Sequence, residues 1–292
     1  MIRYTPRLPG KNVNISKESP LREFFVLISG ILAFIVGIYF VLGFAVDLIV
    51  PLISPETEQA LAAGMLKNFG MAEKTEDAKN RIIQSLTDEL QKKCVNLPYR
   101  FHIRIADEDT INAVALPGGH IVVFRGLLEK AASENELAFV LFHEMGHFVH
   151  RDHLRGFGRG LVFIAISSFL LGPDNDISAL LLQGLHISEM KFSREQETRA
   201  DEFALDMLYC AYGDVSGAAL FFGKMAKEEH SPGVIGKYWL SHPESKARIS
   251  HLEDYCSRHG FPASADLRPL PESLRFRDAP ASYPESADSN RK

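Results

Sequence analysis

Long apolar runs, helical spacing and strand-like alternation follow one another along this chain, and the longest apolar run comes first. Phe24 to Val46 is a stretch of 23 residues without a charged side chain. As a helix it would be roughly 34 Å long, which is enough to cross a bilayer with some tilt. A signal peptide has an apolar core of only about 7–15 residues, and a buried core helix is seldom this long. The run therefore predicts an uncleaved transmembrane anchor over residues 24–50, after a polar tail over residues 1–23.

Helical spacing returns after the anchor. Glu56 to Phe69 and Thr75 to Cys94 are predicted helices within a linker region, residues 51–96. The second of them has an apolar face that is expected to pack on the domain that follows. Further on, Leu161 to Leu171 is an apolar run too short to cross a bilayer. Together with the apolar Ile177 to Leu185, it predicts a helical hairpin packed near the functional site.

That hairpin has an alternative interpretation as an interfacial or plug-like segment. Arg151, Arg155 and Arg159 recur every four residues just before it. They would either meet anionic lipid or form a solvated basic face.

Strand-like alternation falls between the two helical regions. Arg100 to Ile105 alternates with His102 and Arg104 on its polar side. Ile111 to Leu116 and His120 to Phe124 predict a hairpin closed by Pro117, Gly118 and Gly119. The sequence thus predicts a small sheet ahead of a mainly helical region. Residues 261–292 are rich in Pro, Ser, Ala and charge, which is typical of a disordered tail.

The candidate chemistry begins on the helix after this hairpin. Ser133 and Glu136 form a capping box that predicts the helix start, and Gly156 is a plausible stop. Between them lies His143-Glu144-Met145-Gly146-His147, an H-E-x-x-H motif. Residues four apart share a helix face, so both imidazoles can bind one metal ion while Glu144 reaches a water on it. The motif also arises by chance on ordinary helices.

A second capped helix supplies a third ligand candidate. Ser193 and Gln196 form another capping box, and Glu197 and Asp201 follow at four-residue spacing. Small alanines on that face would allow close approach to the motif helix. Glu197 can complete a zinc shell of three protein ligands, and Asp201 can accept a hydrogen bond from a ligand histidine. The alternative is a solvated charged face.

These segments carry a resemblance to a known family. His143-Glu144-x-x-His147 followed by Glu197-x-x-x-Asp201 resembles the membrane-associated zinc metallopeptidases that include HtpX, the CAAX prenyl protease, and periplasmic and mitochondrial quality-control proteases. Residues 112–123, Asn-Ala-Val-Ala-Leu-Pro-Gly-Gly-His-Ile-Val-Val, are similar to the family's edge-strand region. Residues 241–249, Ser-His-Pro-Glu-Ser-Lys-Ala-Arg-Ile, are similar to its His-Pro…Arg-Ile signature.

The resemblance implies an α+β, mainly helical zincin-like domain over residues 97–260, with a small β-sheet and one N-terminal transmembrane helix before it. It implies one zinc ion per chain, held by His143, His147 and Glu197. Zinc lowers the pKa of a water to about 7, and Glu144 is expected to act as the general base.

Three further residues are expected to assist the reaction. These are Asp201 beside a ligand histidine, and His242 and Arg248 as partners of the developing oxyanion. For Arg248, an intrahelical ion pair with Glu244 is an equally good interpretation. The family often has Arg-His after the motif, whereas this chain has Arg151-Asp152-His153, so no role is carried over to that histidine.

Composition and charge narrow the function and the location. A net charge of −5 argues against nucleic-acid binding. Cys94, Cys210 and Cys256 are too few for a disulfide framework, although one pair can bridge in an oxidising compartment. Five basic residues precede the anchor, and only Lys67 follows within about 20 residues. The positive-inside rule therefore predicts a cytoplasmic N-terminus, with the remaining chain on the periplasmic or equivalent trans side of the inner or cell membrane. The basic residues are Arg3, Arg7, Lys11, Lys17 and Arg22.

The sequence and this resemblance together predict a single-pass zinc endopeptidase that cleaves unfolded or extended polypeptides, and the resemblance implies a role in protein quality control. Its expected partners are such polypeptides and the lipid bilayer. One alternative is a membrane-tethered holdase with a zinc site and little proteolysis. Another is a zinc hydrolase of non-peptide substrates. Glu144 separates enzyme from holdase, because a structural zinc site has four ligands and needs no general base.

Overall fold

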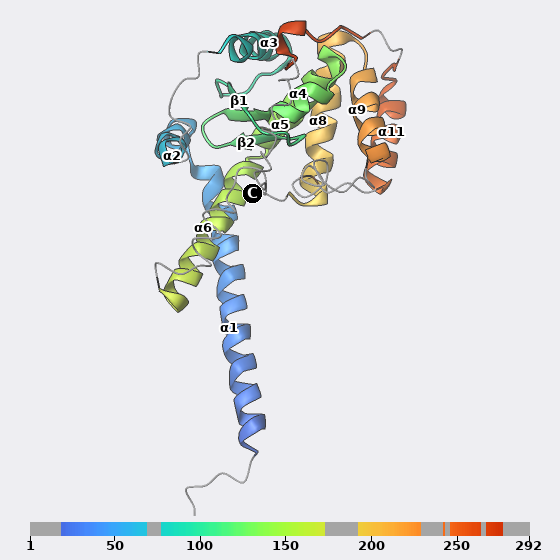
Figure 1. Cartoon of the computed structure of the whole chain (residues 1–292). Coiled ribbons are helices and arrows are strands. Elements are labelled where there is room, and N and C mark those ends of the chain that lie inside the picture. Colours follow the sequence, from blue (N-terminus) through green and yellow to red (C-terminus); the bar gives the residue numbers. More distant parts are fainter. Residues whose placement is uncertain are drawn as a thin grey trace, which may run out of the picture.

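A computed structural model describes residues 19–68, 77–172, 192–228, 242, 246–263 and 267–276. A mainly helical domain encloses a three-stranded sheet, and one long helix projects away from it (Figure 1). This confirms the α+β, mainly helical fold class and the single apolar helix ahead of the domain.

The projecting helix is α1, Pro20–Ile49, which begins with proline at its first turn. Its apolar side chains face outward, and no residue of its most apolar window is buried. A short 3₁₀ turn, Val50–Leu52, and helix α2, Pro55–Asn68, follow it. The predicted anchor and the first predicted linker helix thus correspond to α1 and α2.

The sheet has the strand order β1-β3-β2. Its strands are β1 His102–Ala106, β2 Ala113–Leu116 and β3 His120–Phe124. Strand β1 runs parallel to β3, and β2 pairs antiparallel with β3, which confirms the predicted hairpin. Gly118 and Gly119 close it with φ values of 81° and 82°. A Cβ on Gly119 would lie 2.5 Å from the Arg100 carbonyl oxygen, so a larger residue does not fit there.

Helix α5, Glu134–Val149, runs through the middle of the domain, and nearly all of its residues are buried. It contacts the sheet, α3 (Ala78–Cys94), α8 (Arg194–Tyr212) and α9 (Ser216–Glu228). The domain is completed by α4, Arg125–Lys130, and α11, Lys246–His259. As expected, the apolar face of α3 packs into this core through Ile83 and Leu90.

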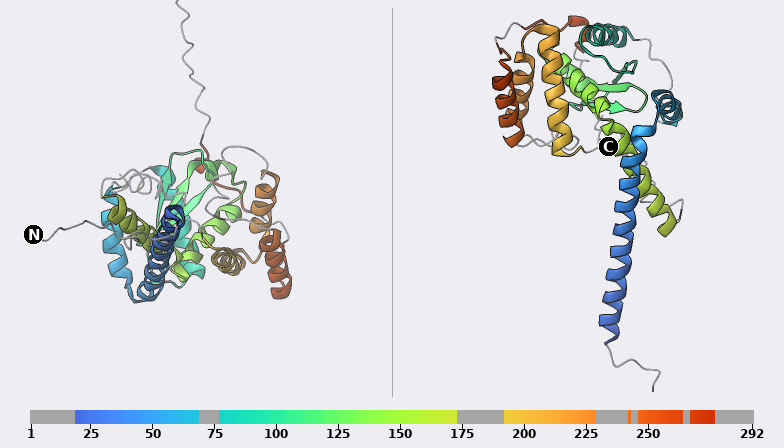
Figure 2. Two further views of the ribbon diagram at one scale, coloured as in Figure 1. Left: turned by 90° about the horizontal axis from the view of Figure 1, so that it is seen from below. Right: turned by 180° about the vertical axis from the view of Figure 1, so that it is seen from behind.

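The expected helix stop at Gly156 is wrong, and of the predicted hairpin only residues 161–171 are described. Helix α5 ends at Val149 and Gly156 lies inside the next helix, α6, Asp152–Leu171. The chain turns between them at Arg151, whose φ of 57° is left-handed. Helix α6 then leaves the domain and packs along α1, as both side views show (Figures 1 and 2). The other arm of the predicted hairpin, residues 177–185, lies outside the described residues.

The three arginines around the start of α6 bind the end of α1 and the turn after it. Arg151 donates to the Val50 carbonyl at 2.9 Å. Arg159 donates to the Asp47 carboxylate at 2.8 Å, and Arg155 Nε lies 3.4 Å from the same group. Arg151 and Arg155 are therefore engaged within the protein, whereas the Arg159 side chain remains 43% exposed beside Asp47.

The predicted disordered tail is corrected over residues 267–276. Leu270 and Leu274 are buried in the core, with exposed fractions of 3% and 0%. The Glu134 N–H donates to the Arg268 carbonyl at 2.9 Å, so this segment also holds the start of α5. Burial of these two leucines orders the segment, although the residues around them are mostly polar.

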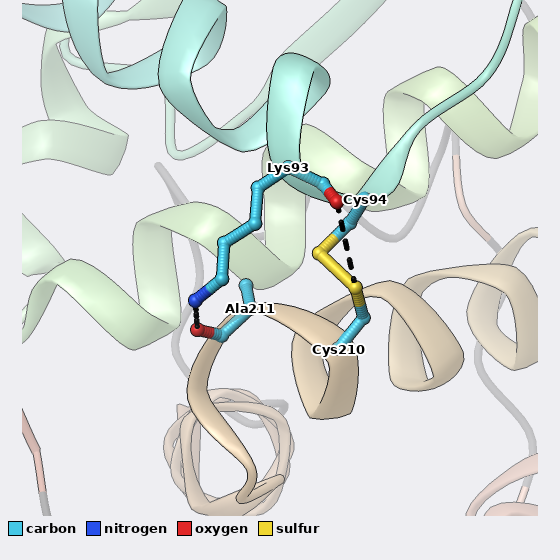
Figure 3. The surroundings of a disulfide bond; sticks show 4 residues. All are labelled: Lys93, Cys94, Cys210 and Ala211. Carbon is cyan, nitrogen blue, oxygen red and sulfur yellow. Dashed lines mark hydrogen bonds between the residues drawn. A yellow bond between two sulfur atoms is a disulfide. The ribbon is translucent and has the colours of Figure 1, made fainter.

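A disulfide joins α3 to α8. Cys94 and Cys210 are bonded, with their Cα atoms 5.9 Å apart. The Lys93 amine donates to the Ala211 carbonyl beside it (Figure 3). The bridge closes a loop of 116 residues around the sheet and α5, and Cys256 remains free.

Candidate metal centre

Two helices and one loop residue bring four potential ligands together. His143 and His147 lie one turn apart on α5, and Glu197 faces them from the first turn of α8. His242 comes from outside both helices. One ligand atom of each residue lies within 4.8 Å of those of the others, and all four side chains are buried.

A glycine on α5 allows α8 to come this close. A Cβ added to Gly146 would lie 2.9 Å from the Ala200 Cα atom and 3.0 Å from its carbonyl oxygen. Ala200 itself is fully buried. Gly146 and Ala200 therefore set the distance between α5 and α8 that brings Glu197 close to the two histidines.

Each motif histidine has a carboxylate behind it. His143 Nδ1 lies 2.8 Å from Asp201 Oδ1, and His147 Nδ1 lies 3.4 Å from Asp152 Oδ2. Since a carboxylate only accepts, each Nδ1 carries the proton and each Nε2 presents its lone pair to the ligand group. The expected contact between Asp201 and a ligand histidine is present.

The sequence did not single out Asp152. Its other oxygen accepts from Gln196 Nε2 at 2.7 Å, and Gln196 belongs to the capping box of α8. The Phe192 ring stacks on His147 at 3.8 Å between centroids. The sequence does contain one signal for this contact, a carboxylate five residues after the motif. That carboxylate reaches back to His147 only because the chain makes a left-handed turn at Arg151.

Arg248 is buried and faces carboxylates on every side of its guanidinium. Its Nη1 lies 2.9 Å from Glu197 Oε2, and its Nη2 donates to Asp201 Oδ1 at 2.9 Å. Its Nε donates to Asp201 Oδ2. The guanidinium of Arg248 thus binds both Glu197 and Asp201, a contact that the sequence did not predict. Its role beside an oxyanion stays a prediction, and Glu244, the other proposed partner, lies outside the described residues.

His242 lies among the ligand atoms. Its Nδ1 is 3.0 Å from Glu197 Oε1 and 3.2 Å from His143 Nε2. Its Nε2 is 3.7 Å from Glu144 Oε1. The position fits a ligand as well as a charge partner, and the oxyanion role stays a prediction.

The charges at the site stabilise ionised carboxylates. Burial acts to raise the pKa of Glu197, but the charge and hydrogen bond of His242 and the charge of Arg248 hold it well below its usual range. Burial also acts to raise the pKa of Asp201, but Arg248 and His143 lower that pKa overall. Burial lowers the pKa of His147, which keeps that imidazole neutral and able to donate its lone pair.

These residues fit a zinc ion. His147 Nε2 and both oxygens of Glu144 are buried without a hydrogen-bond partner in the described part of the chain. Buried polar atoms are rarely left in this state, and a cation with a water beside it would satisfy all three. Two imidazoles and one carboxylate are a common ligand set of catalytic zinc sites.

Comparison with known proteins identifies the family of the chain. Residues 77–256 match peptidase family M48. The chain is 35% identical over 157 residues to mitochondrial metalloendopeptidase OMA1 of Arabidopsis thaliana, covering 52% of this chain and 31% of that protein. It is 33% identical to the OMA1 protein of Schizosaccharomyces pombe, covering 53% of this chain and 47% of that protein.

A bacterial protein is similar as well. The metalloprotease LoiP of Escherichia coli is 31% identical over 171 residues, covering 56% of this chain and 65% of LoiP. The chain therefore spans between about a third and two thirds of these relatives' lengths.

Proposed function

Because the chain belongs to peptidase family M48, we propose that it is a membrane-anchored zinc endopeptidase that cleaves unfolded or extended polypeptides. The observation that carries the proposal is Glu144. Its carboxylate is buried beside the ligand group, and neither oxygen has a hydrogen-bond partner among the described residues. A structural site would have no use for such a group.

The chain's own residues divide the chemistry between them. His143, His147 and Glu197 would hold zinc, which supplies a Lewis acid and lowers the pKa of a water. Glu144 takes a proton from the attacking water and delivers it to the leaving amine, a step worth roughly 10²–10⁴-fold in rate. Asp201 and Asp152 fix the two imidazoles, and Arg248 is a positioning residue that holds Glu197 and Asp201.

The decisive experiment compares Glu144→Gln with Glu197→Ala in the purified full chain. Glu144→Gln keeps the shape of the side chain, so zinc content should stay at one per chain while casein cleavage falls at least roughly 10²-fold. Glu197→Ala should lose both zinc and cleavage. A chelator should abolish wild-type cleavage.

Three outcomes would reject the proposal. Cleavage by Glu144→Gln at the wild-type rate would remove the general base. A wild-type protein that binds zinc and unfolded polypeptide but never cleaves would be the holdase. Zinc-dependent hydrolysis of non-peptide substrates alone would favour the third interpretation.

The edge strand supports an extended substrate. Phe124 N donates to the Asn112 carbonyl at 3.0 Å, and pairing alternates along an antiparallel ladder. Val114 and Leu116 therefore bond to β3, while the backbone groups of Ala113 and Ala115 point to the open edge. Backbone pairing there would read an extended conformation more than side chains, which suits unfolded substrates and a quality-control role.

All four side chains of β2 are buried, because both faces of the strand are covered, so only its backbone edge is available. The Ala113 N–H already donates to Asn112 Oδ1 at 2.9 Å. Ala115 is therefore the better position at which to test substrate pairing.

Two features support a location across the membrane from the N-terminus. The basic residues before α1 predict a cytoplasmic start, and α1 is long and apolar enough to span. The Cys94–Cys210 bridge belongs to an oxidising compartment, since such bonds are rare in the cytosol. A reporter fused after residue 260 should be active only on the trans side, and cytoplasmic activity would overturn this orientation.

A further inference from the structure

We propose that the C-terminal half of α6 is embedded in the lipid leaflet next to the catalytic domain, beside α1, and holds the metal centre close to the bilayer. The inference rests on the proposed membrane anchor and adds a second lipid contact. The lipid-facing segment is defined here as residues 161–171, the C-terminal half of α6.

The side chains of this segment are apolar and exposed. Phe169 is 89% exposed, and Leu170 and Leu171 are 50% and 58% exposed. Leu161 and Phe163 are close to half exposed. These positions lie around most of the helix circumference, whereas the domain end of α6 is buried at Leu154. An apolar surface of this kind marks a contact with another apolar medium.

The segment continues the apolar surface of α1, which is proposed to lie in lipid. Helices α1 and α6 pack along each other, and a Cβ on Gly158 would lie 2.6 Å from Val46 Cγ1. Tyr39 of α1 and Phe163 of α6 meet edge to face at 6.2 Å between ring centroids. Figure 2 shows the two helices leaving the domain on the same side. If α1 lies in lipid, the exposed side of α6 faces the same lipid.

Charged and aromatic side chains indicate where the bilayer surface lies. Arg22 to Tyr39 is 18 residues, or about 27 Å of helix, close to the thickness of a hydrocarbon core. Tyrosine is enriched at membrane interfaces. The ion pair of Arg159 with Asp47 lies about 12 Å further up α1, outside the hydrocarbon, where charge is tolerated.

This level fixes the depth of α6. Phe163 lies beside Tyr39, and eight residues remain to Leu171, about 12 Å of helix. That length reaches into one leaflet, since a leaflet is about half of the roughly 30 Å core. The segment is therefore an interfacial helix end and not a second span, which agrees with its 11-residue length.

The consequence for function is a short distance between bilayer and site. Asp152, which contacts His147, begins α6 only 11 residues before Phe163, or about 17 Å along the helix. An extended chain covers about 3.3 Å per residue. About five extended residues would thus connect a bilayer-anchored polypeptide to the metal centre, which makes such polypeptides the favoured substrate class.

The test places an environment-sensitive fluorophore at single cysteines of the full chain. The background is Cys256→Ser, since Cys94 and Cys210 are bonded to each other. The positions are Phe169→Cys on α6, Phe34→Cys on α1 and Asp107→Cys on the domain surface. All three residues are well exposed, so folding should be unaffected. Each protein is reconstituted in phosphatidylcholine vesicles and quenched by nitroxide-labelled lipid or by aqueous iodide.

We expect the probes at positions 169 and 34 to be quenched by nitroxide lipid, with iodide quenching several-fold weaker than at position 107. A probe at 169 that iodide quenches as strongly as the one at 107, while the probe at 34 stays in lipid, overturns this inference and leaves the anchor in place. Aqueous probes at both positions overturn the anchor as well.

Discussion

Glu58 offers the sharpest test of how the segment after α1 is joined to the catalytic domain. It lies on α2 and is fully buried. Its Oε2 accepts from the Tyr99 hydroxyl, and its Oε1 accepts from Gly118 N–H and His153 Nε2, each at 2.8 Å. One carboxylate thus joins α2, the turn that closes β2 and β3, and the first turn of α6.

The magnitude follows from those three donors. Glu58→Ala leaves all of them buried without their acceptor, and breaking a buried pair of this kind costs about 3–5 kcal/mol. Glu58→Gln keeps the shape of the side chain, but its amide N–H then faces one of the three donors. The free energy of unfolding is therefore expected to fall by about 1–3 kcal/mol. Glu56→Ala, two residues earlier on the exposed face, is the matched control and should stay within about 0.5 kcal/mol.

The stabilisation by Glu58 should depend on pH in a definite direction. Burial acts to raise the pKa of Glu58, but the hydrogen bond and charge of His153 and the N–H of Gly118 lower it overall. A carboxyl whose folded pKa is depressed stabilises fully above its unfolded pKa, about 4.3, and this stability is lost as pH falls through the folded value. The difference between wild type and Glu58→Gln should therefore be constant near pH 7 and shrink below about pH 4.3.

The assay is urea unfolding of the detergent-solubilised full chain at several pH values. The reasoning would be refuted if Glu58→Ala lowered the free energy of unfolding no more than Glu56→Ala. A wild-type advantage over Glu58→Gln that grew towards acid pH would refute the assigned charge state.

Three further predictions concern the disulfide, the centre and the edge strand. Cys94→Ser opens a loop of 116 residues, worth about 4–5 kcal/mol by loop entropy, so its Tm should fall by about 10 °C or more, and reductant should lower only the wild-type Tm; equal melting would contradict this. Asp152→Asn should weaken zinc binding about 10–100-fold through His147, measured by competition with a chelator, and unchanged affinity would exclude the contact. Ala115→Pro should raise KM for an unfolded polypeptide with zinc content unchanged, whereas Ala113→Pro should do less because its N–H is already bonded within the chain.

The elements that carry the candidate metal ligands could be predicted because their signals are local. Ser133 accepts from the Glu136 N–H at 3.2 Å, as a capping residue should. Ser193 and Gln196 form both bonds of a capping box. Helical spacing then places two histidines on one face of α5 and two carboxylates on one face of α8. Only the meeting of those faces needed the tertiary structure.

The residues that sequence reasoning missed depend on contacts between distant segments. Glu58 and His153 are 95 residues apart, and nothing in the local pattern joins them. The carboxylates that contact Arg248 lie on α8, whereas the sequence suggested either a developing oxyanion or a neighbour four residues away as its partner. Residues 267–276 look like a tail in composition, although Leu270 and Leu274 fill a gap in the core.

Three consecutive residues connect the segment around α1 and α2 to the candidate metal centre. Arg151 donates to the Val50 carbonyl just after α1, Asp152 holds the ring of His147, and His153 binds Glu58. A backbone with positive φ at a residue other than glycine is costly, and here the Arg151 side chain is held in place by the chain that follows α1. If that segment moved relative to the domain, the turn would lose its support, and the carboxylate behind His147 would move with it. The left-handed turn at Arg151 thus links the position of α1 to the geometry of His147.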